Sequence, residues 1–215
     1  MKPLLLFKNV RFYILLFSIF LSIFLYFYYQ INPDPNYPLI HNLMHNYALI
    51  AASYLYIALL IGPFCYNFKT PYNSKLIKAR RAVGVSAFYF AFLHYLIGFY
   101  GYLGGFSKLF TLEPKYLLAI SLSYTALLIL FLMASTSFDF MIKKMTFIRW
   151  KLLHRLVYAA GIFVLIHALL IGEHFQNPNP ISITATVLIG FLIYLEGKRI
   201  IANLKSISSK NGKSS

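Results

Sequence analysis

Six long apolar segments, separated by short polar stretches, are the feature that most constrains what this chain can fold into. Several of them approach the ~20 residues that an α-helix needs to cross the hydrocarbon core of a bilayer. The predicted spans are residues 12–31, 47–66, 82–102, 116–138, 152–172 and 181–195. None of these segments alternates apolar and polar residues as a barrel strand would. The sequence therefore predicts an all-α, polytopic membrane protein, with a six-helix bundle over residues 12–200.

The composition excludes a soluble domain. Of the 215 residues, 60% are hydrophobic and only 12% are charged, whereas a soluble domain has about 45–50% apolar and about 25% charged residues. The chain also has a single cysteine, Cys65. One cysteine excludes an internal disulfide, a CxxC redox pair and the CxxCH attachment of c-type haem.

The net charge of +15 could indicate nucleic-acid binding, but the basic residues are placed as a membrane topology requires. When the loops are assigned to alternate sides, 18 of the 20 lysine and arginine residues fall on one side. An excess of basic residues marks the cytoplasmic side. Both termini are thus predicted to be cytoplasmic, with residues 1–11 as an N-terminal segment and residues 201–215 as a polar, disordered tail. The placement of the basic residues on one side thus predicts contact with membrane lipid and no nucleic-acid partner.

Charged residues are almost absent from the predicted spans, so histidines at depth stand out. At a rise of 1.5 Å per residue, His94 lies roughly 20 Å beyond Arg81, and His167 lies roughly 24 Å beyond Lys151. The two histidines are thus at similar depth on separate helices, as the two axial ligands of one b-type haem would be. The alternative is that each histidine only bonds a neighbouring carbonyl. Gly98, one turn beyond His94, either leaves room for the macrocycle or is a close helix contact.

A second site is predicted near the basic side of the bundle, around His154. It lies thirteen residues before His167, which places the two about 140° apart around an ideal helix. Either two haems contact different sides of this helix, or the helix is distorted, with Gly161 as the candidate position. Arg80 shares roughly the face of His94, and it either contacts haem propionates or anchors its helix at the membrane surface. The remaining histidines are expected to be solvated or interfacial, with no ligand role: His41, His45 and His174.

Two stretches of the sequence carry a family resemblance. The first runs from Arg80-Arg81-Ala-Val-Gly84 to Leu93-His94, and the second runs from Trp150-Lys-Leu-Leu-His154 to Ile166-His167. Both resemble the ferric-reductase-like transmembrane family, and within it the MsrQ (YedZ) branch. The resemblance covers about residues 10–200, and the spacing of the three histidines is its most specific element.

The resemblance implies a membrane subunit with one or two b haems, for which His94, His167 and His154 would be iron ligands, and it adds FMN as a candidate cofactor. It further implies that electrons from the quinone pool or a cytosolic flavin reductase cross the bacterial inner membrane. Their acceptor would be a separate catalytic partner, a periplasmic MsrP-like molybdopterin enzyme that reduces methionine sulfoxide in oxidised proteins. One alternative is a transmembrane reductase acting directly on outer ferric or cupric ions. Another is a non-redox scaffold or transporter whose histidines only bond across helices.

Overall fold

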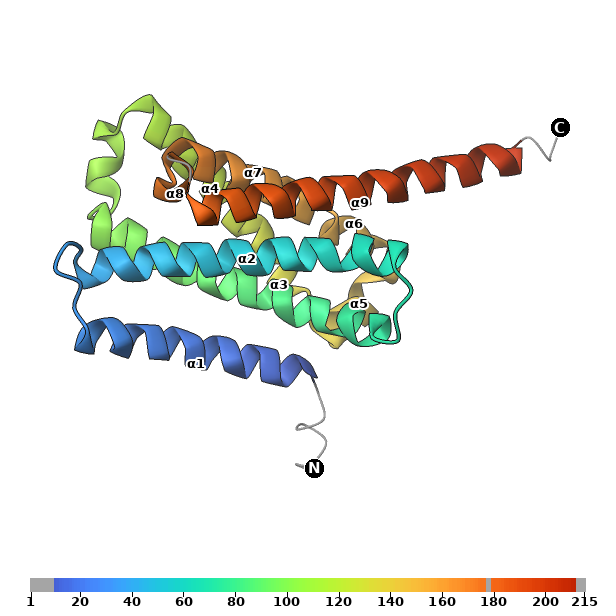
Figure 1. The fold of residues 1–215 in the computed structure, drawn as a ribbon, viewed down its shortest axis with the longest axis horizontal. Helices are drawn as coiled ribbons and strands as arrows, with labels where there is room; N and C mark the ends of the chain where they lie inside the picture. Colours follow the sequence, from blue (N-terminus) through green and yellow to red (C-terminus); the bar gives the residue numbers. More distant parts are fainter. Residues whose placement is uncertain (1–9, 177–178, 212–215) are drawn as a thin grey trace, which may run out of the picture.

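The computed structural model describes residues 10–176 and 179–211, and within these ranges the chain is helical and without strands (Figure 1). Six spans are long and apolar enough to cross a membrane, which confirms the predicted all-α, polytopic architecture. They consist of α1 (Val10–Ile31), α2 (Leu39–Asn67), α3 (Asn73–Leu96) with its π-helical extension η2 (Ile97–Tyr102), α4 (Pro114–Ser135), α6 (Phe147–His154) with α7 (Val157–Ile171), and α9 (Pro180–Asn211). Three short helices connect them: η3 (Phe106–Thr111), α5 (Asp139–Met145) and α8 (Glu173–Gln176).

Several helices extend beyond the apolar segments that predicted them. The second helix begins at Leu39 rather than at residue 47, and the third begins at Asn73 rather than at residue 82. The last helix continues through Asn211, so much of the segment expected to be a disordered tail is helical. The cause is that hydropathy marks only the part of a helix that needs an apolar sequence, whereas backbone hydrogen bonding continues into the polar flanks. Residues 1–9 and 212–215, parts of the two predicted terminal segments, lie outside the described residues.

The fifth predicted span is not one continuous helix. It divides into α6 and α7, and Arg155 and Leu156 lie in a turn between them. The distortion therefore comes directly after His154 and not at the expected Gly161. This glycine instead allows a close approach between α7 and α2, because a Cβ atom on it would lie 3.0 Å from Cδ1 of Leu59. The hydroxyl of Tyr56 also donates a hydrogen bond to the Gly161 carbonyl at 2.9 Å.

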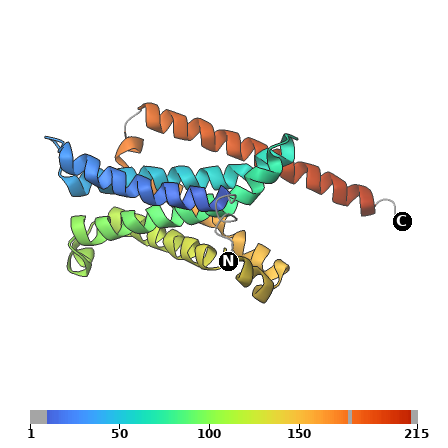
Figure 2. The ribbon, with the colours of Figure 1, turned by 90° about the horizontal axis from the view of Figure 1, so that it is seen from below.

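The bundle has two chemically different ends. The start of α1, the turn between α2 and α3, the short helices α5 and α6 and the second half of α9 lie together at one end (Figures 1 and 2). We call it the basic end, since it carries Arg11, Lys69, Arg81, Lys144 and Lys198. The opposite end holds the connection from α1 to α2, the segment from η2 to α4, and α8.

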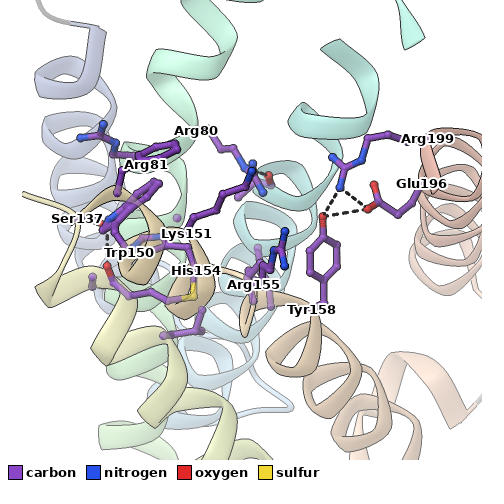
Figure 3. A pocket seen from close by; sticks show the side chains of 18 of the residues that line it. Arg80, Arg81, Ser137, Trp150, Lys151, His154, Arg155, Tyr158, Glu196 and Arg199 are labelled. Carbon is purple, nitrogen blue, oxygen red and sulfur yellow. Dashed lines mark hydrogen bonds and ion pairs between the residues drawn. The ribbon is translucent and has the colours of Figure 1, made fainter. Parts of the chain in front are cut away.

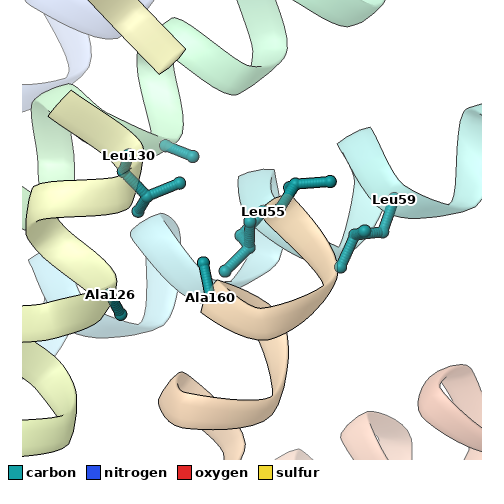
Figure 4. Close-up of a cluster of buried hydrophobic side chains, with 7 residues drawn as sticks. Leu55, Leu59, Ala126, Leu130 and Ala160 are labelled. Carbon is teal, nitrogen blue, oxygen red and sulfur yellow. The ribbon is translucent and has the colours of Figure 1, made fainter. Parts of the chain in front are cut away.

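Four helices, α2, α3, α4 and α7, surround the central core (Figure 4). Its larger side chains include Leu55 and Leu130, and three alanines complete it at mid-bundle: Ala87, Ala126 and Ala160, each at most 1% exposed. Small residues at such positions allow membrane helices to pack closely. Ala87 stands seven residues from both Arg80 and His94 along α3, so this packed layer separates a site near each end of the bundle.

Candidate functional site

Two histidine rings face each other across the bundle. His94 lies in the last turn of α3 and His167 lies near the end of α7. Their ring centres are 6.3 Å apart, and the ring planes are inclined by 79°. The structure thus brings together the two histidines that depth alone paired in the sequence.

Each of these rings is held by a hydrogen bond to the backbone of a neighbouring helix. Nδ1 of His94 lies 3.0 Å from the carbonyl oxygen of Met44, and Nδ1 of His167 lies 2.9 Å from the carbonyl oxygen of Ala119. A carbonyl oxygen can only accept, so in both rings Nδ1 carries the hydrogen. This leaves the lone pair on Nε2, and a hydrogen bond from the other ring nitrogen is the usual way to orient an imidazole that ligates a metal.

The distance between the rings suits an iron atom between them. Two metal–nitrogen bonds of about 2 Å, plus about 1 Å from each nitrogen to its ring centre, separate axial imidazoles by about 6 Å. The observed 6.3 Å agrees with this separation. His94 and His167 therefore fit the paired ligation of a haem, and the carbonyl bonds that were the alternative interpretation are compatible with it because they use only Nδ1.

Arg80 repeats the contact geometry of His94 at the basic end. Its Nε donates a hydrogen bond of 2.8 Å to the carbonyl oxygen of Ala58. Residues 80 and 94 are fourteen apart on α3, and their acceptors, residues 58 and 44, are fourteen apart on α2. The two antiparallel helices thus hold both side chains in register, about 21 Å apart along the bundle.

A cavity of about 630 Å³ opens at the basic end, between α2, α3, α4, α6, α7 and α9 (Figure 3). Its size is typical of a pocket for a cofactor or another small molecule. Its wall carries several cations: Arg80, Arg81, Lys151, Arg155 and Arg199. Such a lining favours an anionic group, such as the propionates of a haem or the phosphate of a flavin nucleotide.

His154 lies in the wall of this cavity, in a different setting from the other two deep histidines. The ring centre of Trp150 lies 4.1 Å from that of His154, and His154 Nε2 is 3.3 Å from Thr136 Oγ1. The Thr136 hydroxyl donates to the carbonyl of Leu132 at 2.7 Å, so it accepts from His154. His154 therefore carries its hydrogen on Nε2 and its lone pair on Nδ1, the reverse of His94 and His167.

A three-residue cluster closes the α9 side of the cavity (Figure 3). Arg199 contacts Oε1 of Glu196 at 2.5 Å, and Tyr158 donates to the same oxygen at 3.2 Å. Arg199 also donates to the Tyr158 hydroxyl at 3.2 Å. The other carboxylate oxygen, Oε2, is buried without a hydrogen-bond partner among the described residues. A donor group on an occupant of the cavity would satisfy it.

Gly98 lies in η2, the π-helical turn that follows His94. A Cβ atom at this position would meet Sδ of Met44 at 3.5 Å, so the glycine faces α2. Its predicted contact with a macrocycle stays a prediction.

The matches to known proteins agree with this arrangement. A family model described as "Ferric reductase like transmembrane component" matches residues 46–166, more than half of the chain. The chain belongs to this ferric-reductase-like transmembrane family. The matched segment contains Arg80, His94 and His154, and it ends one residue before His167.

Three curated relatives of this ferric-reductase-like chain are informative. The magnetosome protein MamZ of Magnetospirillum gryphiswaldense is 34% identical over 118 residues, covering 53% of this chain and 17% of MamZ. MsrQ of Agrobacterium fabrum, a protein-methionine-sulfoxide reductase heme-binding subunit, is 29% identical over 170 residues, covering 77% of this chain and 75% of that protein. MsrQ of Ralstonia nicotianae is 29% identical over 99 residues, covering 43% of this chain and 42% of its own length. The alignments thus span less than half of MamZ and of the Ralstonia protein.

Several residues of the basic-end cavity were not predicted as site residues. Trp150, Tyr158 and Glu196 line this cavity, and the sequence assigned a contact to none of them. A signal was available for Glu196, since a carboxylate inside an apolar helix, three residues before Arg199, indicates an ion pair. Nothing in the sequence indicated that the backbone of Met44 and Ala119 would accept from histidines.

An ion-pair cluster joins three helices of this ferric-reductase-like chain at the basic end. Asp139, at the start of α5, contacts Arg81 of α3 at 2.5 Å and Arg11 of α1 at 3.5 Å. The hydrogen bond from Arg81 is the main cause that lowers the pKa of Asp139 below its ordinary value of 3.8, and the charge of Arg11 adds to it. Asp139 therefore helps to fix the connection between α4 and α6, which carries Trp150 into the cavity wall.

Replacing Asp139 with asparagine is expected to lower the free energy of unfolding by less than about 1 kcal/mol at neutral pH, because the carboxylate is exposed and screened. A lowered pKa in the folded state adds stability above the unfolded pKa, and this stability is lost as the pH falls through the folded pKa. The difference between Asp139→Asn and the unchanged protein should thus be equal at pH 7 and pH 5, decrease as the pH falls below 3.8, and disappear once the pH is below the lowered pKa of Asp139. Thermal unfolding in detergent measures it. A difference that grows on acidification would contradict the assignment.

Proposed function

We propose that this chain is a b-haem electron-transfer subunit of a bacterial inner membrane. It takes electrons from quinol or a cytosolic flavin reductase and passes them to a periplasmic, MsrP-like methionine sulfoxide reductase. The observation that carries the proposal is the facing pair of His94 and His167, with 6.3 Å between ring centres and, in both rings, Nδ1 hydrogen bonded to a backbone carbonyl so that the lone pair is on Nε2. Membership of the ferric-reductase-like family supports a membrane redox subunit, and the two MsrQ relatives, heme-binding subunits by name, support the cofactor and the partner.

The charge distribution supports an orientation with the basic end in the cytoplasm, because lysine and arginine gather on that side of membrane proteins. In this orientation the cavity lined by His154 and Arg80 meets the electron donor. His94 and His167 then lie toward the periplasmic acceptor.

The chain's own residues bind and orient the cofactor. His94 and His167 would hold the haem iron through Nε2, and the carbonyls of Met44 and Ala119 fix the tautomer of each ring and raise its basicity. The bound haem iron would supply the one-electron chemistry by changing between its ferric and ferrous states. The packed mid-bundle alanines exclude water between the two ends of the molecule.

At the basic end, the cations around Arg80 would bind an anionic cofactor. The carboxylates of a second haem beside His154 and the phosphate of FMN share the chemistry that this lining recognises. The Trp150 ring packs against His154 with 31° between the ring planes and helps to fix the position of the imidazole. The described residues near His154 contain no second histidine within the cavity wall, so a haem there would take its other ligand from a different group.

A direct reductase of outer ferric or cupric ions is the second candidate, and the family description favours it. The experiment compares two acceptors. The purified protein is reduced, freed of excess reductant without oxygen, and mixed either with an MsrP-like enzyme and methionine sulfoxide or with ferric citrate. We expect the haem absorption to return to its oxidised form rapidly with the enzyme and slowly with the iron salt. The opposite order would replace the proposal by the metal reductase, and a colourless preparation would contradict both.

A further inference from the structure

A second histidine cluster lies at the end of the bundle opposite the basic end, outside the segment that matches the family model. His41 and His45 occupy the first two turns of α2, four residues apart on one face, and Glu173 begins α8. Nε2 of His45 lies 2.8 Å from Oε2 of Glu173, and Nε2 of His41 lies 3.9 Å from the same oxygen. All three ligand atoms lie within 4.8 Å of one another.

The cluster is held in place by its neighbours. The ring of Tyr37 stacks on His41 with 4.4 Å between centres and 9° between planes, and the Tyr37 hydroxyl donates to Oε1 of Glu173 at 3.4 Å. Oε2 is thus left facing the two imidazoles. In addition, Nδ1 of His41 is buried without a hydrogen-bond partner among the described residues. A single ion pair between His45 and Glu173 would not account for the convergence of His41 on the same oxygen.

The geometry points to a binding site for a divalent transition-metal ion, such as zinc, formed by His41, His45 and Glu173. Imidazole nitrogens and a carboxylate oxygen are typical zinc ligands, and ligand atoms about 2 Å from one ion in a tetrahedron lie about 3.3 Å from each other. The observed separations of 2.8 Å and 3.9 Å bracket this value, so small side-chain adjustments bring them to it. Two histidines and one glutamate leave a coordination position open for water or a further ligand.

The site joins parts of the chain that are far apart in sequence. Its ligands fix the start of α2 to the connection between α7 and α9, and His45 and Glu173 are 128 positions apart in the sequence. His45 also directly follows Met44, whose carbonyl accepts from His94. A metal ion here would therefore hold the backbone that orients His94, so metal binding should change the absorption spectrum of a haem bound by His94. The metal site itself does not depend on the proposed function.

Zinc titration of the purified full chain, after treatment with EDTA and its removal, tests the site by calorimetry. We expect one saturable equivalent of zinc per chain, a zinc-dependent rise in the midpoint temperature of unfolding, and an affinity at least about tenfold lower in Glu173→Gln and in His45→Gln. Glu113→Gln is the matched control, since Glu113 precedes α4 outside the cluster, and it should bind zinc as the unchanged protein does.

Stability in EDTA separates a lost site from a lost fold. Glu173→Gln should unfold within a few degrees of the unchanged protein when no metal is present, and it should then show little further rise with zinc. The proposal is overturned if the unchanged protein takes up no stoichiometric zinc. It is also overturned if Glu173→Gln, folded in EDTA, retains the full affinity.

Discussion

Alanine at either His94 or His167 is expected to abolish one low-spin haem of the purified protein. Each ring would supply one nitrogen ligand, and the 6.3 Å between their centres suits one iron atom bound by both. Loss of one ligand would weaken haem binding and change the spin state of the iron, so we expect the bis-histidine spectrum of this haem to disappear. Absorption spectroscopy with haem quantitation measures both effects.

Two further variants make this result specific. His174→Ala alters a histidine at the same end of the bundle, near His45, and should leave the spectrum and the haem content unchanged. His154→Ala should affect only a haem at the basic end. If the His94 and His167 variants both keep full haem content and a bis-histidine spectrum, the pairing of these two residues is wrong.

Replacement of Arg80 with glutamine is expected to lower the affinity of the basic-end cavity for its anionic cofactor by about tenfold or more. A charge-assisted hydrogen bond contributes about 1.5–3 kcal/mol, and about 1.4 kcal/mol corresponds to a tenfold change in affinity. Because a nearby cation destabilises the more positive ferric form, its removal should also lower the midpoint potential of a haem in this cavity. Cofactor content and redox titration of the purified protein give the two readouts.

A matched substitution tests whether this effect belongs to the cavity. Arg149 is exposed on α6 and is not part of the cavity wall, so Arg149→Gln removes the same charge from the same end of the bundle. It should leave cofactor content and potential close to those of the unchanged protein. Equal effects of the two variants would assign Arg80 to the overall charge of the basic end instead of to the bound anion.

Hydropathy alone predicted the six spans, because the bilayer demands apolar sequence over a known length. It did not predict where the helices end, since backbone bonds continue through polar flanks such as residues 73–81. It also missed the turn at Arg155 and Leu156, where no proline or glycine marks the break. That turn separates α6 from α7, so the angle between His154 and His167 could not be derived from an ideal helix.

The part of the candidate site that could be predicted is the depth of each histidine in the membrane. Counting residues from basic anchors placed His94 and His167 at one level, and the structure brings the rings together. Partners contributed by backbone carbonyls or by distant helices leave no such pattern, as the contact of Ala119 with His167 illustrates. The same limit applies to His41, which was expected to have no ligand role: its proximity to Glu173 arises because α2 already begins at Leu39 and the first residue of α8 lies beside it.

We expect one iron atom to bind both His94 and His167. Anomalous scattering from iron, measured on crystals of the haem-loaded protein, tests it most directly because it locates the metal itself. The expected result is an iron peak about 2 Å from Nε2 of both residues, with Nδ1 of His94 still bonded to the carbonyl of Met44 and Nδ1 of His167 to that of Ala119. An iron peak bonded to only one of them, or found only in the cavity beside His154, would contradict it.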